Sequence, residues 1–347
     1  MGVQNVCVWE RDVTGTKRHA LLAGDAGGTK TSLAIYVSVD SLDAPLAEGT
    51  FPSASYDSLE ALIAQFLAAH DIAVDRACLG VAGPVIDGTA RITNLPWVIA
   101  ENRLAESLGL SSVRLINDLA AVATAVPHYD DAHLHTLQAG RAMTGGTIAV
   151  VAPGTGIGEA YLTWDGQQYR AHASEGGHAD FAPTDERQRE LLGWLQERFG
   201  HVSVERVASG SGIPNIYEFL KDTGRADEPE WLARQLAAAA DPTPVIVNTA
   251  VDRERTCDIC RATLEIFIAA LGAETSNLAL KLLATGGVYL GGGIPPRILP
   301  ALTDGRFLEA FNRKGRFVEL LTRMPVHVIL DFKAALLGAA RHGFAGE

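Results

Sequence analysis

Two glycine-rich turns in the sequence have the composition of a phosphate-binding loop. They are Asp25-Ala26-Gly27-Gly28-Thr29-Lys30 and Gly154-Thr155-Gly156-Ile157-Gly158. Because glycine lacks a Cβ, the backbone N–H groups of such a turn can converge on phosphate oxygens. Neither turn matches the P-loop, and a strand follows each one where a dinucleotide-binding unit needs a helix. A tight hairpin that binds nothing stays open as the alternative for each turn taken alone.

Asn117 and Asp118 stand where a short apolar segment gives way to a run of small residues. The pattern predicts a strand followed by a helix, which places Asp118 at a helix N-terminus, where the dipole keeps a carboxylate ionised. Ligands of α/β proteins bind at this end of the strands, and an ionised aspartate can accept a proton from a hydroxyl group. Aspartate is also a favoured N-cap, so a purely structural role is the alternative.

A third candidate is the segment from Ser174 to Phe181, in which Glu175, His178 and Asp180 stand beside two glycines. A carboxylate accepts two hydrogen bonds and a neutral histidine donates or accepts one, which suits the hydroxyls of a small polar ligand. A metal site is the competing interpretation, since Glu-x-x-His spacing ligates metals on helices. Adjacent glycines disfavour a helix here.

A fourth candidate, Gly291-Gly292-Gly293, follows a predicted strand over residues 288–290. Three residues without side chains offer a flat surface that could receive a nucleobase or a ribose. A plain turn that leads into a helix is the equally simple alternative.

The elements that must position these residues repeat along the chain. Leu21–Val37 and Ile148–Trp164 both read as strand, glycine turn and strand, and the two can be superposed turn on turn. This similarity predicts an internal duplication, with two α/β halves that each present a glycine turn to one cleft. Amphipathic spacing predicts helices over Tyr56–His70 and Cys257–Leu283. We therefore expect an α/β protein.

Composition excludes several classes of protein. The 347 residues carry 41 acidic and 29 basic side chains, and a net charge of −12 repels phosphate backbones and anionic lipids. Because of this charge, we expect no nucleic-acid partner and no binding to a membrane surface. No apolar run reaches the ~18 residues that a membrane span needs. The four cysteines, including Cys257-x-x-Cys260, supply neither a disulfide framework nor the four ligands of a structural zinc site. A cytoplasmic protein is the expectation.

Seven segments, in order along residues 21–342, resemble those of the bacterial glucokinases, ATP-dependent enzymes of the hexokinase/actin-like superfamily. They are GDAGGTKTSLAIY (24–36), GVAGPV with TNLPW (80–97), LINDLAAV (115–122), PGTGIGEAYL (153–162), SEGGHADFAP (174–183), GHVSVERVASGSGI (200–213) and GGVYLGGGIPPRIL (286–299).

The resemblance implies a duplicated actin/hexokinase-like (ribonuclease H-like) α/β fold with a small and a large domain around a central cleft. It divides the chain into an N-terminal extension (1–20), a small domain (21–128, joined by 326–347) and a large domain (129–325). It further implies a cytoplasmic enzyme, and family members are commonly homodimers.

The resemblance also implies a role for each candidate. Asp118 matches the base that takes the proton from the 6-hydroxyl of glucose, and Asp25 matches the carboxylate that holds Mg²⁺, through water. The sugar-binding residues would be Asn94, Asn117, Asp118, Glu175, His178 and Glu205. The contacts to ATP would come from Asp25, Gly27, Gly28, Thr29, Lys30, Gly154, Thr155, Gly156, Gly291, Gly292 and Gly293.

Some residues depart from the family pattern, and some functions stay open. Lys30 is more typical of the related repressor/kinase branch, whose zinc cluster of histidines and cysteines is absent here. Ala152-Pro153, Glu159 and Lys333 also depart from it. Mannose, fructose, glucosamine or N-acetylglucosamine could replace glucose. A sugar-sensing regulator or an actin-like ATPase are the rival classes, although no helix-turn-helix fits before Asp25.

Overall fold

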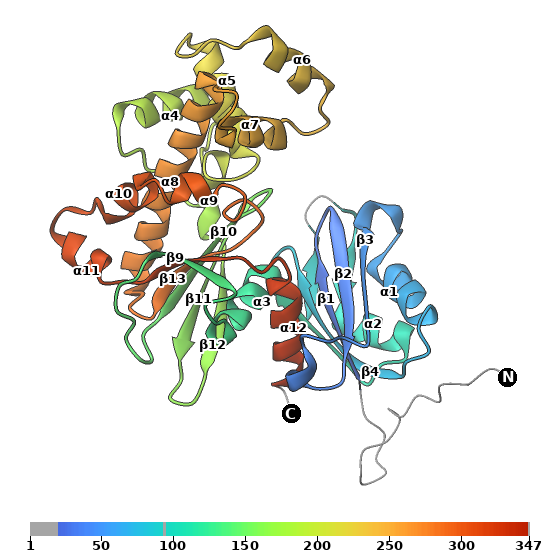
Figure 1. Cartoon of the computed structure of the whole chain (residues 1–347). Helices are drawn as coiled ribbons and strands as arrows, with labels where there is room; N and C mark the ends of the chain where they lie inside the picture. Colours follow the sequence, from blue (N-terminus) through green and yellow to red (C-terminus); the bar gives the residue numbers. More distant parts are fainter. Residues whose placement is uncertain (1–19, 93–94, 346–347) are drawn as a thin grey trace. The chain divides into compact units, whose positions relative to one another are not determined.

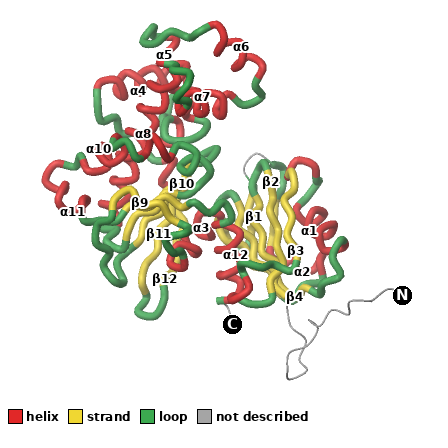
Figure 2. The backbone as a smooth tube through the Cα atoms, viewed as in Figure 1, coloured by secondary structure: helices red, strands yellow, loops and turns green. Residues whose placement is uncertain are grey.

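The computed structural model describes residues 20–92 and 95–345 (Figure 1). Asn94 and the extension predicted before Ala20 lie outside the described residues. The chain divides into two compact units, one formed by residues 1–127 and 333–347 and the other by residues 128–332. Each unit is built on its own β-sheet (Figure 2).

The sheet of the first unit has the strand order β3-β2-β1-β4-β8. Strands β1, β2 and β3 pair antiparallel, whereas β1, β4 and β8 run parallel. The strands are β1 (Ala20–Ala26), β2 (Lys30–Tyr36), β3 (Ala47–Pro52), β4 (Val74–Val81) and β8 (Ser112–Asn117).

Helices cover both faces of this sheet because alternate residues of each strand point to opposite sides. Leu22 and Leu33 pack in one cluster with helices α1 (Leu59–Ala68) and α2 (Glu101–Leu108). Leu21 and Ala23 pack in another cluster with α3 (Asp118–Ala125) and α12 (Ala334–Phe344). With both faces buried, the strands read as continuous apolar runs.

Small residues bring α3 and α12 together. A Cβ on Gly338 would lie 1.7 Å from the carbonyl oxygen of Ala121, so the two helices touch backbone to backbone. Beside the main sheet lies a small one of strands β5 (Val85–Ile86), β6 (Thr89–Arg91) and β7 (Val98–Ala100). Asp87 and Gly88 join β5 to β6 with φ of 49° and 68°, the type I′ turn that their sequence predicts.

The sheet of the second unit repeats this plan. Its order is β12-β11-β10-β13-β14-β9, and the first five strands pair in the same directions as those of the first unit. The strands are β9 (Leu134–Gln138), β10 (Ile148–Pro153), β11 (Ile157–Trp164), β12 (Tyr169–Ser174), β13 (Gly287–Leu290) and β14 (Val326–Ile329). The predicted α/β class and its internal duplication are confirmed.

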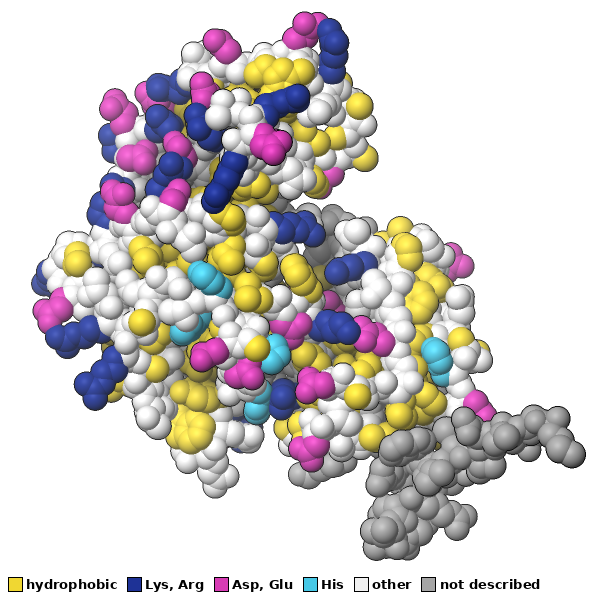
Figure 3. All heavy atoms as spheres, viewed as in Figure 1, with side chains coloured by type: hydrophobic (Ala, Val, Ile, Leu, Met, Phe, Trp, Pro, Cys, Tyr) yellow, Lys and Arg dark blue, Asp and Glu magenta, His cyan; other side chains and the backbone are white. Residues whose placement is uncertain are grey.

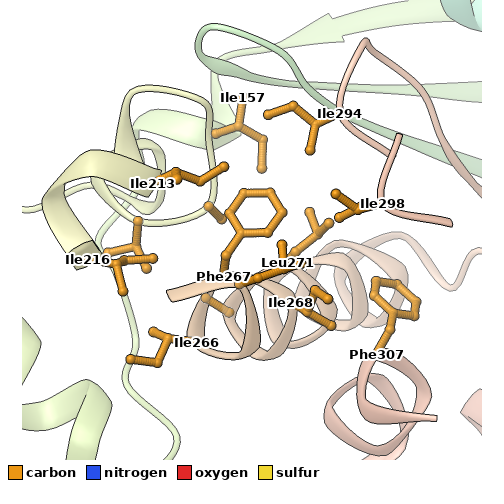
Figure 4. Close-up of a cluster of buried hydrophobic side chains, with 14 of the residues drawn as sticks. Ile157, Ile213, Ile216, Ile266, Phe267, Ile268, Leu271, Ile294, Ile298 and Phe307 are labelled. Carbon is orange, nitrogen blue, oxygen red and sulfur yellow. The ribbon is translucent and has the colours of Figure 1, made fainter. Parts of the chain in front are cut away.

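The long helix α8 (Asp258–Leu282) forms the centre of the second core. Phe267 and Leu271 are fully buried, and Figure 4 shows them pointing toward Ile157, Ile213 and their neighbours. The remaining helices are α4 (Glu186–Phe199), α5 (Gly212–Asp222), α6 (Glu230–Ala238), α7 (Pro242–Val251), α9 (Leu299–Leu302), α10 (Arg306–Asn312) and α11 (Val318–Thr322). On the face that Figure 3 shows, acidic and basic side chains are interspersed over this unit.

The C-terminal boundary between the units differs from the expected one. The sequence assigned residues 326–347 to the small domain, but β14 pairs with β13 and β9 in the second sheet. The segment that returns to the first unit therefore begins at Lys333. The first segment of the first unit ends at Pro127, one residue before the expected end at residue 128.

Candidate active site

In each unit the candidate residues gather at the edge where the parallel strands end. In the first unit Ala26 ends β1 and Asn117 ends β8. In the second unit Pro153, Leu290 and Ser174 end β10, β13 and β12. This is the edge at which open α/β sheets bind ligands.

The first glycine turn joins β1 to β2 and is held by Ser53, the residue directly after β3. Gly27 N donates to Lys30 O at 3.0 Å, and the Ser53 hydroxyl donates to Gly27 O at 2.7 Å. Asp25 lies at the end of β1, opposite Ser32. Burial raises the pKa of the Asp25 carboxyl to about 6, although the Lys30 ammonium opposes this shift.

Asn117, rather than Asp118, caps helix α3. Its side-chain oxygen accepts hydrogen bonds from Leu119 N at 3.0 Å and Ala120 N at 3.1 Å, and its amide nitrogen donates to Gly83 O at 3.2 Å. The capping alternative for Asp118 is therefore wrong. Asp118 occupies the first helical position, partly exposed, with Oδ1 accepting from Leu119 N at 2.9 Å.

The second glycine turn is fixed by its carbonyl groups. Gly154 O accepts from Gly210 N at 2.8 Å, and Thr155 O accepts from Ser211 N at 2.9 Å. A trans peptide points its N–H away from its C=O. The amides of Thr155 and Gly156 therefore point away from the Gly210 turn, in the arrangement that an anion-binding turn needs.

The third glycine turn lies against the second one. Gly291 N donates to Val151 O at 2.9 Å, and a Cβ on Gly292, whose φ is +80°, would lie 2.5 Å from Pro153 O. Only glycine fits this combination of a left-handed backbone and a close approach. The second and third turns thus form one continuous, side-chain-poor surface within the second unit.

Glu175, His178 and Glu205 converge in the second unit. His178 Nε2 lies 4.0 Å from Glu175 Oε2, and His178 Nδ1 lies 4.0 Å from Glu205 Oε1. Glu205 also accepts a hydrogen bond at 3.1 Å from Ile157 N, which belongs to the second glycine turn. Glu175, His178 and Glu205, here called the sugar-type cluster because such groups suit the hydroxyls of a sugar, therefore adjoin the second glycine turn. Asp180 does not join this set, because it pairs with the exposed His201 at 2.8 Å.

Gly176 and Gly177 allow the loop that carries Glu175 and His178 to lie directly on β11. A Cβ on Gly177 would lie 2.2 Å from Ile157 O, and one on Gly176 would lie 1.9 Å from Glu159 Oε2. The loop forms a short 3₁₀ turn over residues 176–178 rather than the α-helix of a Glu-x-x-His metal site. Among the described residues, no group of three or more His, Cys, Asp or Glu side chains is arranged so that it could hold a metal ion.

Cys257 and Cys260 are ordinary buried thiols. Cys257 is the N-cap of α8 and both side chains are almost fully enclosed. Burial raises the pKa of the Cys260 thiol well above its usual range, which keeps it protonated and unreactive. No helix of the described residues is long and apolar enough to cross a membrane.

The structure thus collects the candidates into two groups, one in each unit. Asp25, the first turn, Asn117 and Asp118 belong to the first unit. The sugar-type cluster and the second and third turns belong to the second unit. Glu159, which stands out in the sequence only as a departure from the family pattern, is 1% exposed beside the loop of Glu175. A glutamate in an otherwise apolar strand is the signal that could have indicated a role for it.

Comparison with known proteins agrees with these features. The family model described as Glucokinase matches residues 22–344. The glucokinase of Trichormus variabilis is 42% identical over 335 residues, covering 92% of this chain and 97% of that protein. These matches confirm the resemblance that the seven motifs indicated.

Solved structures confirm the actin/hexokinase-like fold. A glucokinase from an Antarctic psychrotroph is 33% identical, with a TM-score of 0.78 over 94% of this chain and 99% of that one. A Streptomyces griseus ROK family glucokinase, solved with glucose and AMPPNP, is 19% identical with a TM-score of 0.66 over 94% of this chain and 100% of that one, a likeness of fold alone. The protein belongs to the glucokinase family.

Proposed function

We propose that the protein transfers the γ-phosphate of ATP to the 6-hydroxyl of glucose and releases glucose 6-phosphate and ADP. The observation that carries this proposal is the hydrogen bond from Ile157 N to Glu205, which joins the second glycine turn to the sugar-type cluster. The relatives named as glucokinases support the choice of glucose.

The cluster in the second unit would bind the sugar. Glu175 and Glu205 can each accept hydrogen bonds from two hydroxyls, and His178 can donate one between them. The side chains of Glu175 and His178 are 59% and 61% exposed, so their polar atoms are accessible to a ligand. Glu205 is less exposed, at 28%, and is held by Ile157 N. Binding at these groups would orient the 6-hydroxyl for transfer.

Asp118 would act as the general base. Asn117 supplies the cap of α3, so Asp118 is the first residue of the helix. Its carboxylate lies at the positive end of the helix dipole, and Leu119 N donates to one of its oxygens. The positive end of a helix favours the charged form of a carboxylate, and a carboxylate in that form can accept the proton of a hydroxyl group. Asn117 can still donate one N–H to the sugar, because its amide nitrogen uses only one on Gly83. For the reaction, Asp118 must reach the hydroxyl of the bound sugar.

The glycine turns would hold ATP, with the amides of Thr155 and Gly156 at its phosphates and the surface of Gly291–Gly293 at its adenosine. In the first unit, the turn of Gly27, Gly28, Thr29 and Lys30 would add backbone donors and one cation. The crystal structure of the Streptomyces griseus protein in complex with glucose and AMPPNP supports ATP as the donor.

Asp25 fits the magnesium site that the reaction needs. Mg²⁺ that binds substrate phosphates is commonly held by only one or two protein carboxylates and keeps several of its water ligands. Burial raises the pKa of the Asp25 carboxyl to about 6, and a cation beside a buried carboxylate favours its charged form. When bound, Mg²⁺ would neutralise charge on the transferring phosphoryl group. Asp25 would hold it, through water.

We also propose that the protein is a cytoplasmic homodimer, because members of the glucokinase family are commonly homodimers. Light scattering at micromolar concentration tests the assembly directly. A mass of twice 36.8 kDa is expected, and the monomer mass would contradict it.

An assay of hexose phosphate formation, with ADP release measured in the reactions that contain ATP, tests the activity. Glucose, mannose, fructose, glucosamine and N-acetylglucosamine would be compared, each with ATP, ADP or polyphosphate. We expect ADP release that depends on glucose, ATP and Mg²⁺ and that EDTA abolishes. Equal or higher kcat/KM on another hexose would correct the substrate, and sugar binding without turnover would favour the regulator.

A further inference from the structure

Two buried carboxyl groups, those of Glu159 and Glu274, interact with each other beside the loop that carries Glu175 and His178. Glu159 of β11 is 1% exposed and Glu274 of α8 is 6% exposed. The Oε1 atoms of both carboxyls receive no hydrogen bond from the described residues. Two ionised carboxylates in this position would repel each other without a donor to relieve them.

We propose that Glu159 is a positioning residue for the loop of Glu175 and His178, and that it is held protonated so that its carboxyl donates a hydrogen bond to Glu274. One shared proton supplies the missing donor and removes the repulsion. The inference rests on the proposed role of that loop in binding sugar.

The contact between Glu159 and the loop is direct. Glu159 pairs in register with Ser174, the residue before Glu175. A Cβ on Gly176 would lie 1.9 Å from Glu159 Oε2 and 2.8 Å from its Cδ, so the carboxyl group supports the loop backbone itself. Gly176 N in turn donates to the Ser174 hydroxyl at 3.0 Å. Any movement of the Glu159 carboxyl must therefore move the backbone between Glu175 and His178.

The duplicated fold shows that this position does not need a carboxyl group. In the second hairpin Pro153 pairs with Ile157 and Val151 with Glu159, whereas in the first hairpin Ala26 pairs with Thr31 and Gly24 with Leu33. Glu159 thus corresponds to Leu33, which is fully buried in the apolar core of the first unit. An acid at a buried position costs desolvation free energy that a leucine does not. The presence of Glu159 in the second unit therefore needs a reason other than packing.

The charges around the pair favour a single negative charge. Lys281, also of α8, lies 3.9 Å from Glu274 Oε1, and Glu274 Oε2 accepts from Asn277 at 2.9 Å. Lys314, after α10, donates to Asn277. The nearest cation and the nearest side-chain donor are thus both on Glu274. Burial and then the charge of Glu274 raise the pKa of Glu159 to about 7, against a lowering by Lys281.

The test compares wild type with Glu159→Gln, whose amide donates a hydrogen bond but cannot titrate, and with the exposed control Glu309→Gln of α10. In wild type and in the control, loss of the shared proton above about pH 7 should raise the glucose KM about threefold or more by about pH 9. Glu159→Gln should keep the low KM across this range, with kcat little changed.

Thermal unfolding gives a second readout that needs no substrate. The pKa of Glu159 is raised on folding, so wild type loses stability as the pH rises from about 4.5 to about 7 and no further above that. Over this range its Tm should fall about 3–6 °C more than that of Glu159→Gln. If Glu159→Gln does not fold, Glu274→Gln provides the same comparison, because it removes the like charge.

Identical pH profiles of KM and Tm in wild type and Glu159→Gln would overturn the proposal. So would a Glu159→Gln enzyme whose KM is about tenfold higher even at pH 6, because the site would then require a carboxylate. If wild type did not phosphorylate glucose at all, the proposed function would fail, yet the Tm comparison would still decide whether the proton is shared.

Discussion

The two units share one strand order but carry their hairpin acids in different places. In the first hairpin Asp25 lies at the ligand edge, and Ala152 takes its position in the second. In the second hairpin Glu159 lies inside the core, and Leu33 takes its position in the first. The duplicated scaffold thus carries the proposed base and the proposed metal-binding carboxylate in one half, and Glu175, His178 and Glu205 in the other.

This division predicts that substitutions at the edge of the first unit lower kcat, whereas those in the second raise the KM for sugar. The largest effect is expected for Asp118→Asn, which keeps the shape of the side chain and removes the base. We expect kcat to fall by about 10²-fold or more, with glucose binding measured by calorimetry nearly unchanged. Asp71→Asn, at an exposed position of the same unit, is the control. A variant with more than about a tenth of wild-type kcat would remove Asp118 from this role.

Gly338→Ala tests the packing that holds the helix of Asp118. The added Cβ would meet the Ala121 carbonyl oxygen at 1.7 Å, so α3 and α12 must separate. We expect a loss of about 1–3 kcal/mol in the free energy of unfolding, measured with urea. Gly193→Ala, inside α4 with nothing within 4 Å, should instead gain about 0.5–1 kcal/mol. Equal stability of the two variants would contradict the close helix contact.

Glu175→Gln tests the sugar side. Loss of a charged acceptor should raise the glucose KM about tenfold, with the KM for ATP unchanged. Glu197→Gln, on the exposed surface of α4, should leave both constants as they are. An unaltered glucose KM in Glu175→Gln would place the sugar elsewhere.

The smallest effect concerns the pH dependence of Asp25. Because its pKa is raised to about 6, the carboxyl of the free enzyme gains a proton as the pH falls below that value. The kcat/KM for MgATP should therefore decline about threefold or more between about pH 7 and 5.5. Asp25→Asn should have a lower kcat/KM that no longer shows this step. If the step persists in Asp25→Asn, another group causes it.

The sequence predicted most of what positions the site, because glycine turns and strand ends leave local signals. The type I′ turn at Asp87-Gly88 and the long helix near 258–282 are such cases. The sequence could not show that Asn117 takes the capping role, since both residues are favoured caps and only the backbone path chooses between them. It also could not place Glu159 beside Glu274, which lie 115 positions apart in the sequence and meet only through tertiary packing.

A crystal structure with bound glucose tests the central claim most directly. We expect an Asp118 carboxylate oxygen about 2.6–3.2 Å from the 6-hydroxyl, with Glu175, His178 and Glu205 on the remaining hydroxyls. A carboxylate more than about 10 Å from every atom of the hexose, far beyond hydrogen-bond reach, would contradict the account.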